Sequence, residues 1–138
     1  MKLFLDTNII VDIISKRSGY EDSLQVLRYC ETNHAKAFVS ATTVTDVMYI
    51  LRKHIAPEAV RNAVQTLLSI VDVAGVLKSD ITSAFLSNMK DFEDAVQASC
   101  AARIKSDYIV TRNFKDFEES RIPTVSPSMA LELFAYNP

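Results

Sequence analysis

Four aspartates distributed along the chain are candidates to hold a divalent metal ion. Asp6 directly follows the apolar run 2–5, Asp94 lies near the start of an Ala-rich segment, and Asp46 and Asp116 lie beyond two further apolar runs. Clustered carboxylates repel one another and raise each other's pKa unless a cation lies among them. Mg²⁺ and Mn²⁺ take oxygen ligands of this kind and can activate water for hydrolysis. The four residues therefore predict a site for Mg²⁺ or Mn²⁺ if the fold brings them together.

The chain has too few cysteine and histidine residues for a metal site built from sulfur and nitrogen ligands. Cys30 and Cys100 are the only cysteines, His34 and His54 are the only histidines, and none of them belongs to a Cys-x-x-Cys or Cys/His cluster. A zinc site of nitrogen and sulfur ligands is therefore excluded. We expect the two thiols to be reduced and partly buried.

Short apolar segments alternate with segments of helical periodicity along the whole chain. This alternation is typical of a parallel sheet covered by helices on both faces, which is an α/β fold. The strands are predicted at 2–5, 37–40, 69–73, 108–110 and 124–125. The helices are predicted at 7–14, 21–31, 42–54, 57–68, 79–87 and 91–104, with a last one capped by 126–127.

Polar residues follow the predicted strands. In open parallel sheets, chemistry gathers beyond the carboxyl ends of the strands. The residues expected there are Asp6 after the first strand, Asp46 in the helix after the second, and Thr111, Asn113 and Asp116 after strand 108–110. The helix before that last strand begins with Asp91 and Asp94. Separate parts of the chain would thus contribute acids to one rim of the sheet.

The helix 91–104 is expected to direct one face toward that rim. Helical spacing places Asp91, Asp94, Ala98 and Ala101 on one face, where the small alanines allow close packing on the sheet. Glu93 projects to the other side with Gln97 and Cys100 and is interpreted as ordinary surface.

Each acid also has a purely structural interpretation. Asp6 and Asp91 are good residues to cap the helices that follow them. Asp46 suits a solvated helix face, and Asp116 lies in the charged run 115–119. Because neither interpretation excludes the other, both are kept for each residue.

Length and composition favour one domain. The chain has 138 residues, a hydrophobic fraction of 49% and a formal net charge of −2, so we expect a single domain over 1–138. No apolar run approaches the ~18 residues of a membrane span, and Asp6 interrupts the N-terminal apolar run too early for a signal peptide. A cytoplasmic location is expected. The near-neutral net charge neither indicates nor excludes a nucleic-acid partner.

The run Leu3–Asn8, the segment 91–95 followed by Ala101 and Ala102, and the segment 107–117 resemble the motifs of PIN-domain proteins in order and approximate spacing. The resemblance covers essentially the whole chain and is strongest to the small VapC-type toxins of bacterial toxin–antitoxin pairs. It implies a three-layer α/β/α sandwich and a metal-dependent ribonuclease that hydrolyses RNA phosphodiesters. It also implies a protein antitoxin as partner. The amphipathic stretches 20–32 and 57–68 are candidates to bind that partner or a second subunit in a homodimer, although core packing explains such stripes as well.

The resemblance also implies roles for individual residues. Asp6 matches the first acid of the family, Asp94 the helix acid and Asp116 the late acid, whereas Asp46 stands where a Glu is usual and Asn113 where many members have Asp. Asp6 and Asp94 would bind Mg²⁺ or Mn²⁺ directly, and Asp46 and Asp116 would complete the site. The residues expected to support them are Thr7, Asn8, Asp91, Thr111 and Asn113. Basic residues that could reach RNA phosphates from loops are Lys16, Arg17, Arg112 and Lys115.

Other functions remain open from the residues alone. The shorter side chain of Asp46 favours a PIN fold that is catalytically weak or inactive and serves as a binding module. An orphan PIN nuclease outside a toxin–antitoxin pair is a further possibility. A haloacid-dehalogenase-type phosphatase needs a second Asp two residues after the first, where this chain has Asn8, and it also needs a strand-end Lys. The same missing Lys argues against a receiver-like signalling domain.

Overall fold

A computed structural model describes residues 1–32 and 34–136 of the chain. The strands are β1 (Lys2–Leu5), β2 (Lys36–Ser40), β3 (Asp72–Ala74), β4 (Tyr108–Val110) and β5 (Thr124–Val125). The helices are α1 (Thr7–Ser15), α2 (Tyr20–Glu31), α3 (Ala41–Leu51), α4 (Pro57–Leu68), α5 (Lys78–Leu86), α6 (Phe92–Arg103) and α7 (Pro127–Tyr136), with a 3-10 helix η1 (Phe114–Phe117).

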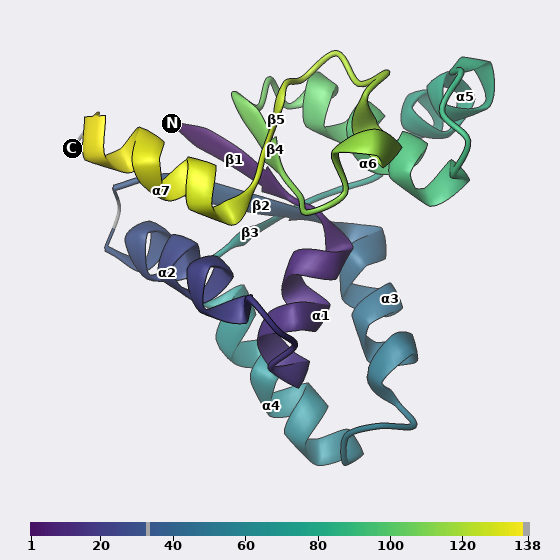
Figure 1. The fold of residues 1–138 in the computed structure, drawn as a ribbon. Coiled ribbons are helices and arrows are strands. Elements are labelled where there is room, and N and C mark those ends of the chain that lie inside the picture. The colour runs from purple at the N-terminus through teal and green to yellow at the C-terminus, as the bar shows by residue number, and fades with distance from the viewer. Residues whose placement is uncertain (33, 137–138) are drawn as a thin grey trace.

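The five strands form one parallel sheet in the order β3-β2-β1-β4-β5 (Figure 1). β1 lies in the centre, paired with β2 on one side and β4 on the other. Crossover helices connect the successive strands, as a parallel sheet requires. Because all strands point the same way, their carboxyl ends lie along one edge, and that edge carries Asp6, Ser40 and Thr111.

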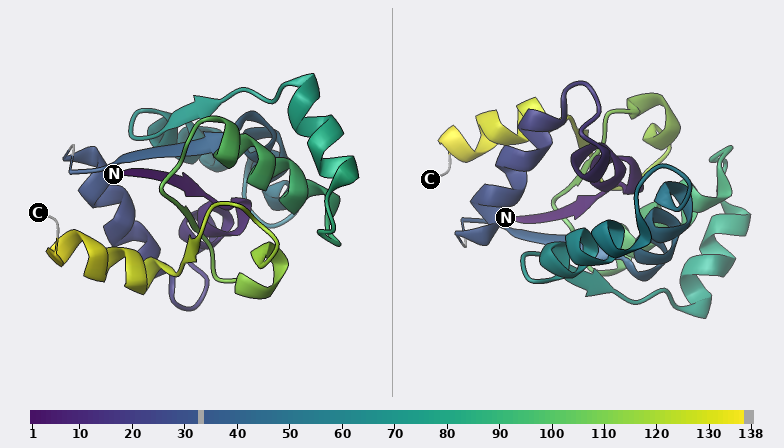
Figure 2. Two further views of the ribbon diagram at one scale, coloured as in Figure 1. Left: turned by 90° about the horizontal axis from the view of Figure 1, so that it is seen from above. Right: turned by 90° about the horizontal axis from the view of Figure 1, so that it is seen from below.

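Alternating side chains of the strands supply two separate cores. Leu3 and Leu5 of β1 and Val110 of β4 belong to a core with α1, α2, α3, α4 and α7. Phe4 and Ile109 point to the opposite face and pack with Ala residues of α6. Figure 2 shows the sheet between these two groups of helices, with α5 lying against α6. The predicted three-layer α/β/α sandwich is therefore confirmed.

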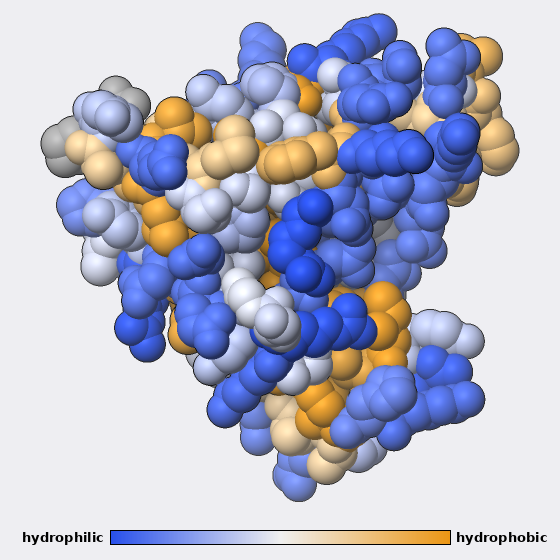
Figure 3. Space-filling model, in the orientation of Figure 1, coloured by the Kyte–Doolittle hydropathy of each residue, from blue (hydrophilic) through white to orange (hydrophobic). Residues whose placement is uncertain are grey.

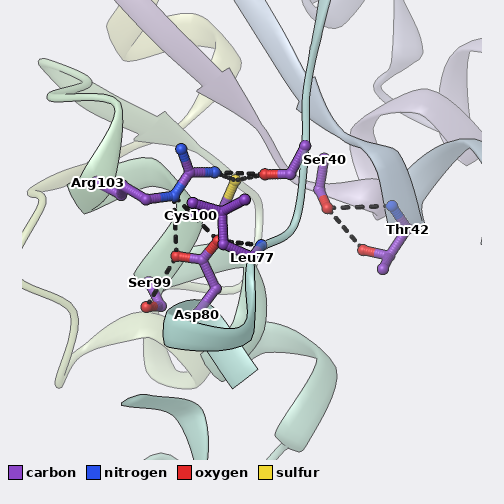
Figure 4. A network of polar contacts seen from close by, with 8 residues as sticks. Ser40, Thr42, Leu77, Asp80, Ser99, Cys100 and Arg103 are labelled. Carbon is purple, nitrogen blue, oxygen red and sulfur yellow. Dashed lines mark hydrogen bonds and ion pairs between the residues drawn. The ribbon is translucent and has the colours of Figure 1, made fainter. Parts of the chain in front are cut away.

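A polar network holds α5 against α6 (Figure 4). The buried Asp80 of α5 accepts hydrogen bonds from Arg103 Nε at 3.1 and 3.2 Å and from the backbone N–H of Leu77 at 2.9 Å. Arg103 also donates to the backbone carbonyl of Gly75, and Ser99 donates to Asp80 at 3.4 Å. This network fixes the position of α6, which carries Asp94, on the side away from the sheet.

Most element boundaries lie within one residue of the predicted ones, and two elements, α3 and β3, differ by more. The predicted helix 42–54 ends at Leu51, because the N–H groups of Arg52 and His54 bond three residues back, to Tyr49 O at 3.4 Å and Leu51 O at 3.1 Å, in a turn that leads to Pro57. The predicted strand 69–73 begins only at Asp72, because the N–H groups of residues 69–71 bond back to carbonyls at the end of α4. No helix within 1–32 and 34–136 is both long and apolar enough to cross a membrane.

Candidate active site

Asp6 occupies the centre of the carboxyl edge of the sheet. Its backbone N–H donates to Val110 O of β4 at 3.0 Å, which continues the pairing of the two central strands by one residue. The residue stands at the N-cap position of α1, but its carboxylate makes no capping hydrogen bond. The side chain is only 1% exposed. The structural interpretation of Asp6 as a helix cap therefore does not explain its buried carboxylate.

Two neutral donors hold the Asp6 carboxylate. Thr111 Oγ1 donates to Oδ2 at 2.9 Å, and Gln97 Nε2 donates to Oδ1 at 3.3 Å. Burial raises the pKa of Asp6 above its ordinary value, and the hydrogen bonds from Thr111 and Gln97, with smaller contributions from the backbone amides of Asn8 and Thr7, lower it in part. Asp6 is thus a desolvated carboxylate that no Lys or Arg side chain neutralises within the described residues.

Asp94 lies near Asp6, in the first turn of α6. Asp91 is the N-cap of this helix and accepts a hydrogen bond from the backbone N–H of Asp94 at 3.0 Å. The pKa of Asp94 is raised to about 7, first by burial and then by the negative charges of Asp6, Asp91, Asp116 and Glu93. Every one of these contributions opposes ionisation. Asp91 therefore fulfils its capping role and also adds to the negative charge around Asp94.

Asp116 and Asn113 lie beyond β4, at the 3-10 helix η1. The N–H of Asp116 donates to Asn113 O at 3.1 Å, and the N–H of Asn113 donates to Thr111 Oγ1 at 3.0 Å. The Asp116 side chain is exposed, yet its charge contributes to the raised pKa of Asp94. The structure thus places the late acid within electrostatic range of the helix acid.

Asp46 of α3 interacts electrostatically with Glu93, but its charge is not among those that raise the pKa of Asp94. Burial raises the pKa of Asp46, and the charge of Asp46 is the largest cause of the raised pKa of Glu93. Glu93 is exposed, as expected of a surface residue, and the negative charge of Asp46 also acts on it. In the space-filling view, the surface is hollowed between α5 and α6 on one side and α3 on the other (Figure 3). The first turns of α1 and α3 meet beneath it, where Thr7 Oγ1 and Thr43 Oγ1 lie 2.8 Å apart.

Gln97 is the residue of this site that sequence reasoning placed on the wrong side. It was expected to project away from the sheet with Cys100, yet both residues are buried and Gln97 contacts Asp6. The reason is that α6 is covered by the sheet on one side and by α5 on another. The only sequence feature that could have indicated a special role for Gln97 is that a glutamine stands within an otherwise Ala-rich segment.

The side chains around Asp94 offer oxygen ligands that suit a hard divalent cation, although the acids do not lie in one compact cluster. All side chains that gather around Asp94 carry oxygen, and within the described residues no positive charge contributes to the shift of its pKa. In residues 1–32 and 34–136, no three acidic, His or Cys side chains lie close enough together to bind one ion as a set. The residues therefore fit a divalent ion at the level of donor chemistry and charge, with Asp6 and Asp94 at the centre.

The basic residues expected to reach RNA differ in whether they already pair with an acid of the protein. Arg112 forms an ion pair with the buried Asp12 of α1, at 2.6 Å from Nε to Oδ2 and 3.0 Å from Nη2 to Oδ1. Arg17 lies 3.8 Å from the same carboxylate. Lys16 and Lys115 are exposed. Arg112 is thus a structural partner that ties the loop after β4 to α1.

Comparisons with known proteins agree with the fold described above. A family model described as PIN domain matches residues 2–115. Ribonuclease VapC1 of Aquifex aeolicus is 28% identical over 102 residues, which is 70% of each chain. The DNA-bound VapBC structure from Salmonella typhimurium aligns with a TM-score of 0.73 and 19% identity, over 92% of this chain and 98% of that one. A toxin–antitoxin complex from Klebsiella pneumoniae aligns with a TM-score of 0.69 and 22% identity, over 91% and 97%. These structural likenesses show a common fold.

Proposed function

The chain belongs to the PIN-domain family, and from this premise we propose that it is a divalent-metal-dependent endoribonuclease of the VapC type. Membership of this family removes the haloacid-dehalogenase-type and receiver-like alternatives. One observation carries the proposal: Asp6 and Asp94, 88 positions apart in the sequence, lie close enough at the carboxyl edge of the sheet for the charge of one to raise the pKa of the other. Similarity to a protein named a ribonuclease supports RNA as the substrate.

The proposed metal ligands are Asp6 and Asp94, with Asp46 and Asp116 completing the site. When bound, Mg²⁺ or Mn²⁺ would polarise the scissile phosphate and lower the pKa of a bound water. Thr111 and Asn8 would support the Asp6 carboxylate, and Thr7 would support the start of α1 through its contact with Thr43. Asp91 and Asn113 would fix the backbone around Asp94 and Thr111.

The partners of the protein are part of the same proposal. RNA would enter the hollow between α3 and the α5–α6 pair, where Asp46 and Glu93 interact electrostatically. The similarity to a toxin–antitoxin complex supports a protein antitoxin that restrains the activity. We propose that the protein acts in the cytoplasm, where RNA and such an antitoxin meet, and that a second copy of the chain is a further candidate partner.

An RNA cleavage assay tests the proposed activity. The purified protein is expected to cleave RNA with Mg²⁺ or Mn²⁺ and to lose cleavage in EDTA. Asp6→Asn and Asp94→Asn are each expected to reduce the rate at least about 100-fold, because each removes a charged oxygen ligand. Asp72→Asn changes an exposed aspartate on the edge strand β3 and is the matched control, with a rate near that of the parent. Equal cleavage by all four proteins would refute the proposal.

A second candidate is a PIN fold that binds RNA or protein without catalysis. It is favoured by Asp46 and Asn113, which replace longer or charged family residues, and by the separation of the acids among the described residues. A melting-temperature titration with Mn²⁺ separates the two candidates, because a ligand that binds the folded state raises its stability. A nuclease is expected to melt at a higher temperature with Mn²⁺, whereas an inactive scaffold is expected to melt at the same temperature.

A further inference from the structure

Gln97 is buried, makes a hydrogen bond through each end of its carboxamide and contacts the proposed metal site. Its side chain is 3% exposed and lies one helical turn after Asp94 on α6. We propose that Gln97 is a positioning residue that orients the Asp6 carboxylate for metal binding, an inference that rests on the proposed function. A buried carboxamide is unfavourable unless its donor and acceptor groups are both satisfied. In this protein both are satisfied at the end of β1.

A backbone amide selects the orientation of the Gln97 side chain. Thr7 is the first residue of α1, so its N–H has no partner within the helix. This N–H donates to Gln97 Oε1 at 3.2 Å. A carboxamide carries its acceptor on one side and its donors on the other. With Oε1 held by Thr7, Nε2 must face Asp6, where it donates to Oδ1 at 3.3 Å.

Thr111 holds the other oxygen of Asp6 by the same principle. Its Oγ1 accepts a hydrogen bond from the backbone N–H of Asn113 at 3.0 Å, so its own proton is available to Asp6 Oδ2 at 2.9 Å. Each carboxylate oxygen then accepts one oriented side-chain donor, and the backbone amides of Asn8 and Thr7 also lie near the carboxylate. Backbone amides at two different chain positions thus determine the orientation of the Asp6 carboxylate.

The two side chains that donate to the Asp6 carboxylate, Gln97 and Thr111, carry no charge. Another buried aspartate, Asp12 in the second half of α1, is paired with the guanidinium of Arg112. A guanidinium against Asp6 would neutralise the carboxylate and compete with a metal ion for it. A carboxamide and a hydroxyl fix the geometry and leave the negative charge in place. Because Gln97 and Asp94 belong to the same helix, α6 would supply both a ligand and the group that orients the other ligand.

Isothermal titration calorimetry with Mn²⁺ tests this role on the metal-free full-length chain. Gln97→Met keeps a linear side chain of similar length and removes both hydrogen bonds. We expect it to weaken Mn²⁺ binding by about 10- to 100-fold, as is usual when a partner of a metal ligand is lost. Ser99→Ala is the matched control, because Ser99 lies two residues away on α6 and donates to Asp80 instead. It is expected to bind Mn²⁺ like the parent.

Amide hydrogen exchange gives a second readout that involves no metal and no catalysis. The Thr7 N–H is expected to exchange faster in Gln97→Met than in the parent or in Ser99→Ala, because its acceptor is gone. Gln97→Asn provides a second variant, since a side chain one methylene shorter cannot bridge Thr7 and Asp6. Circular dichroism identifies which variant retains the fold, and that variant is used for calorimetry.

The outcomes separate this inference from the proposed function. If the parent binds Mn²⁺, Asp6→Asn does not, and the Gln97 variant binds as tightly as the parent, the positioning role is refuted while the metal site stands. If the parent itself does not bind Mn²⁺, the proposed function fails and the inference fails with it. Weaker binding by the Gln97 variant, with Ser99→Ala unchanged, supports the positioning role.

Discussion

Neutralising Asp94 is expected to stabilise the metal-free protein while it abolishes activity. The pKa of Asp94 is raised from 3.8 to about 7 by burial and by four neighbouring carboxylates. At 1.36 kcal/mol per pKa unit, this difference corresponds to a destabilisation of about 4 kcal/mol when the group is fully charged. Asp94 is only half-buried, so solvent screening reduces the expected effect to about 1–2 kcal/mol. Asp94→Asn removes the charge and should recover this free energy.

The pH dependence of this effect has a defined sign. Because the folded state holds the Asp94 proton more tightly than the unfolded state, stability falls as the pH rises from about 4 to 7, and the full penalty remains above pH 7. The stability difference between Asp94→Asn and the parent should therefore be small near pH 4 and grow to about 1–2 kcal/mol at pH 8.

Urea unfolding in EDTA at pH 5 and pH 8 measures this difference. Asp72→Asn, an exposed position on the edge strand β3, is the matched control and should shift the unfolding midpoint little at either pH. The reasoning is refuted if Asp94→Asn is no more stable than the parent at pH 8, or if its advantage is larger at pH 5 than at pH 8. Saturating Mn²⁺ should reverse the order, since only the parent gains binding energy.

Three further predictions concern stability and thiol reactivity. Arg112→Ala is expected to lower the free energy of unfolding by about 2–3 kcal/mol, because Asp12 would remain buried with only the more distant Arg17. Arg17→Ala should lower it by less than about 1 kcal/mol in the same urea experiment, and equal effects would contradict this account. Cys30 is buried with its pKa raised to about 11, so at pH 8 it should resist a thiol reagent in the folded protein and react in urea. Lys16 ends α1 with a φ of 53°, and Lys16→Gly should therefore raise the urea midpoint by the equivalent of about 1 kcal/mol, whereas a lower midpoint would contradict the strain.

The active site illustrates a general conflict between function and stability. The acids gathered at the carboxyl edge raise the pKa of Asp94 and Glu93, and this repulsion opposes folding of the metal-free chain. The fold compensates elsewhere, through the apolar cores on both faces of the sheet and the Asp80–Arg103 network that anchors α6. Removal of a catalytic charge and removal of a core contact should therefore change stability in opposite directions.

The order of the elements, the α/β/α class and the family were predictable from the amino-acid sequence. Strand and helix periodicities are local properties, and a short apolar run such as 2–5 indicates a buried parallel strand without knowledge of its neighbours. Because functional sites of open parallel sheets lie beyond the carboxyl ends of the strands, the positions of Asp6 and Thr111 at the site were also predictable. The N-cap position of Asp91 was also predictable, because capping involves residues only three positions apart.

The contacts between distant side chains depend on the packing of the layers and were not predictable. Gln97 was misplaced because helical spacing gives relative faces, and it does not tell which face packs on the sheet when a second helix, α5, covers the other side. The partners Gln97 and Asp6 are 91 residues apart, and Arg112 and Asp12 are 100 apart. The charge of Asp46 in α3 acts on Glu93 in α6, 47 positions away in the chain. Such pairings depend on how whole layers pack, and no local pattern in the chain records them.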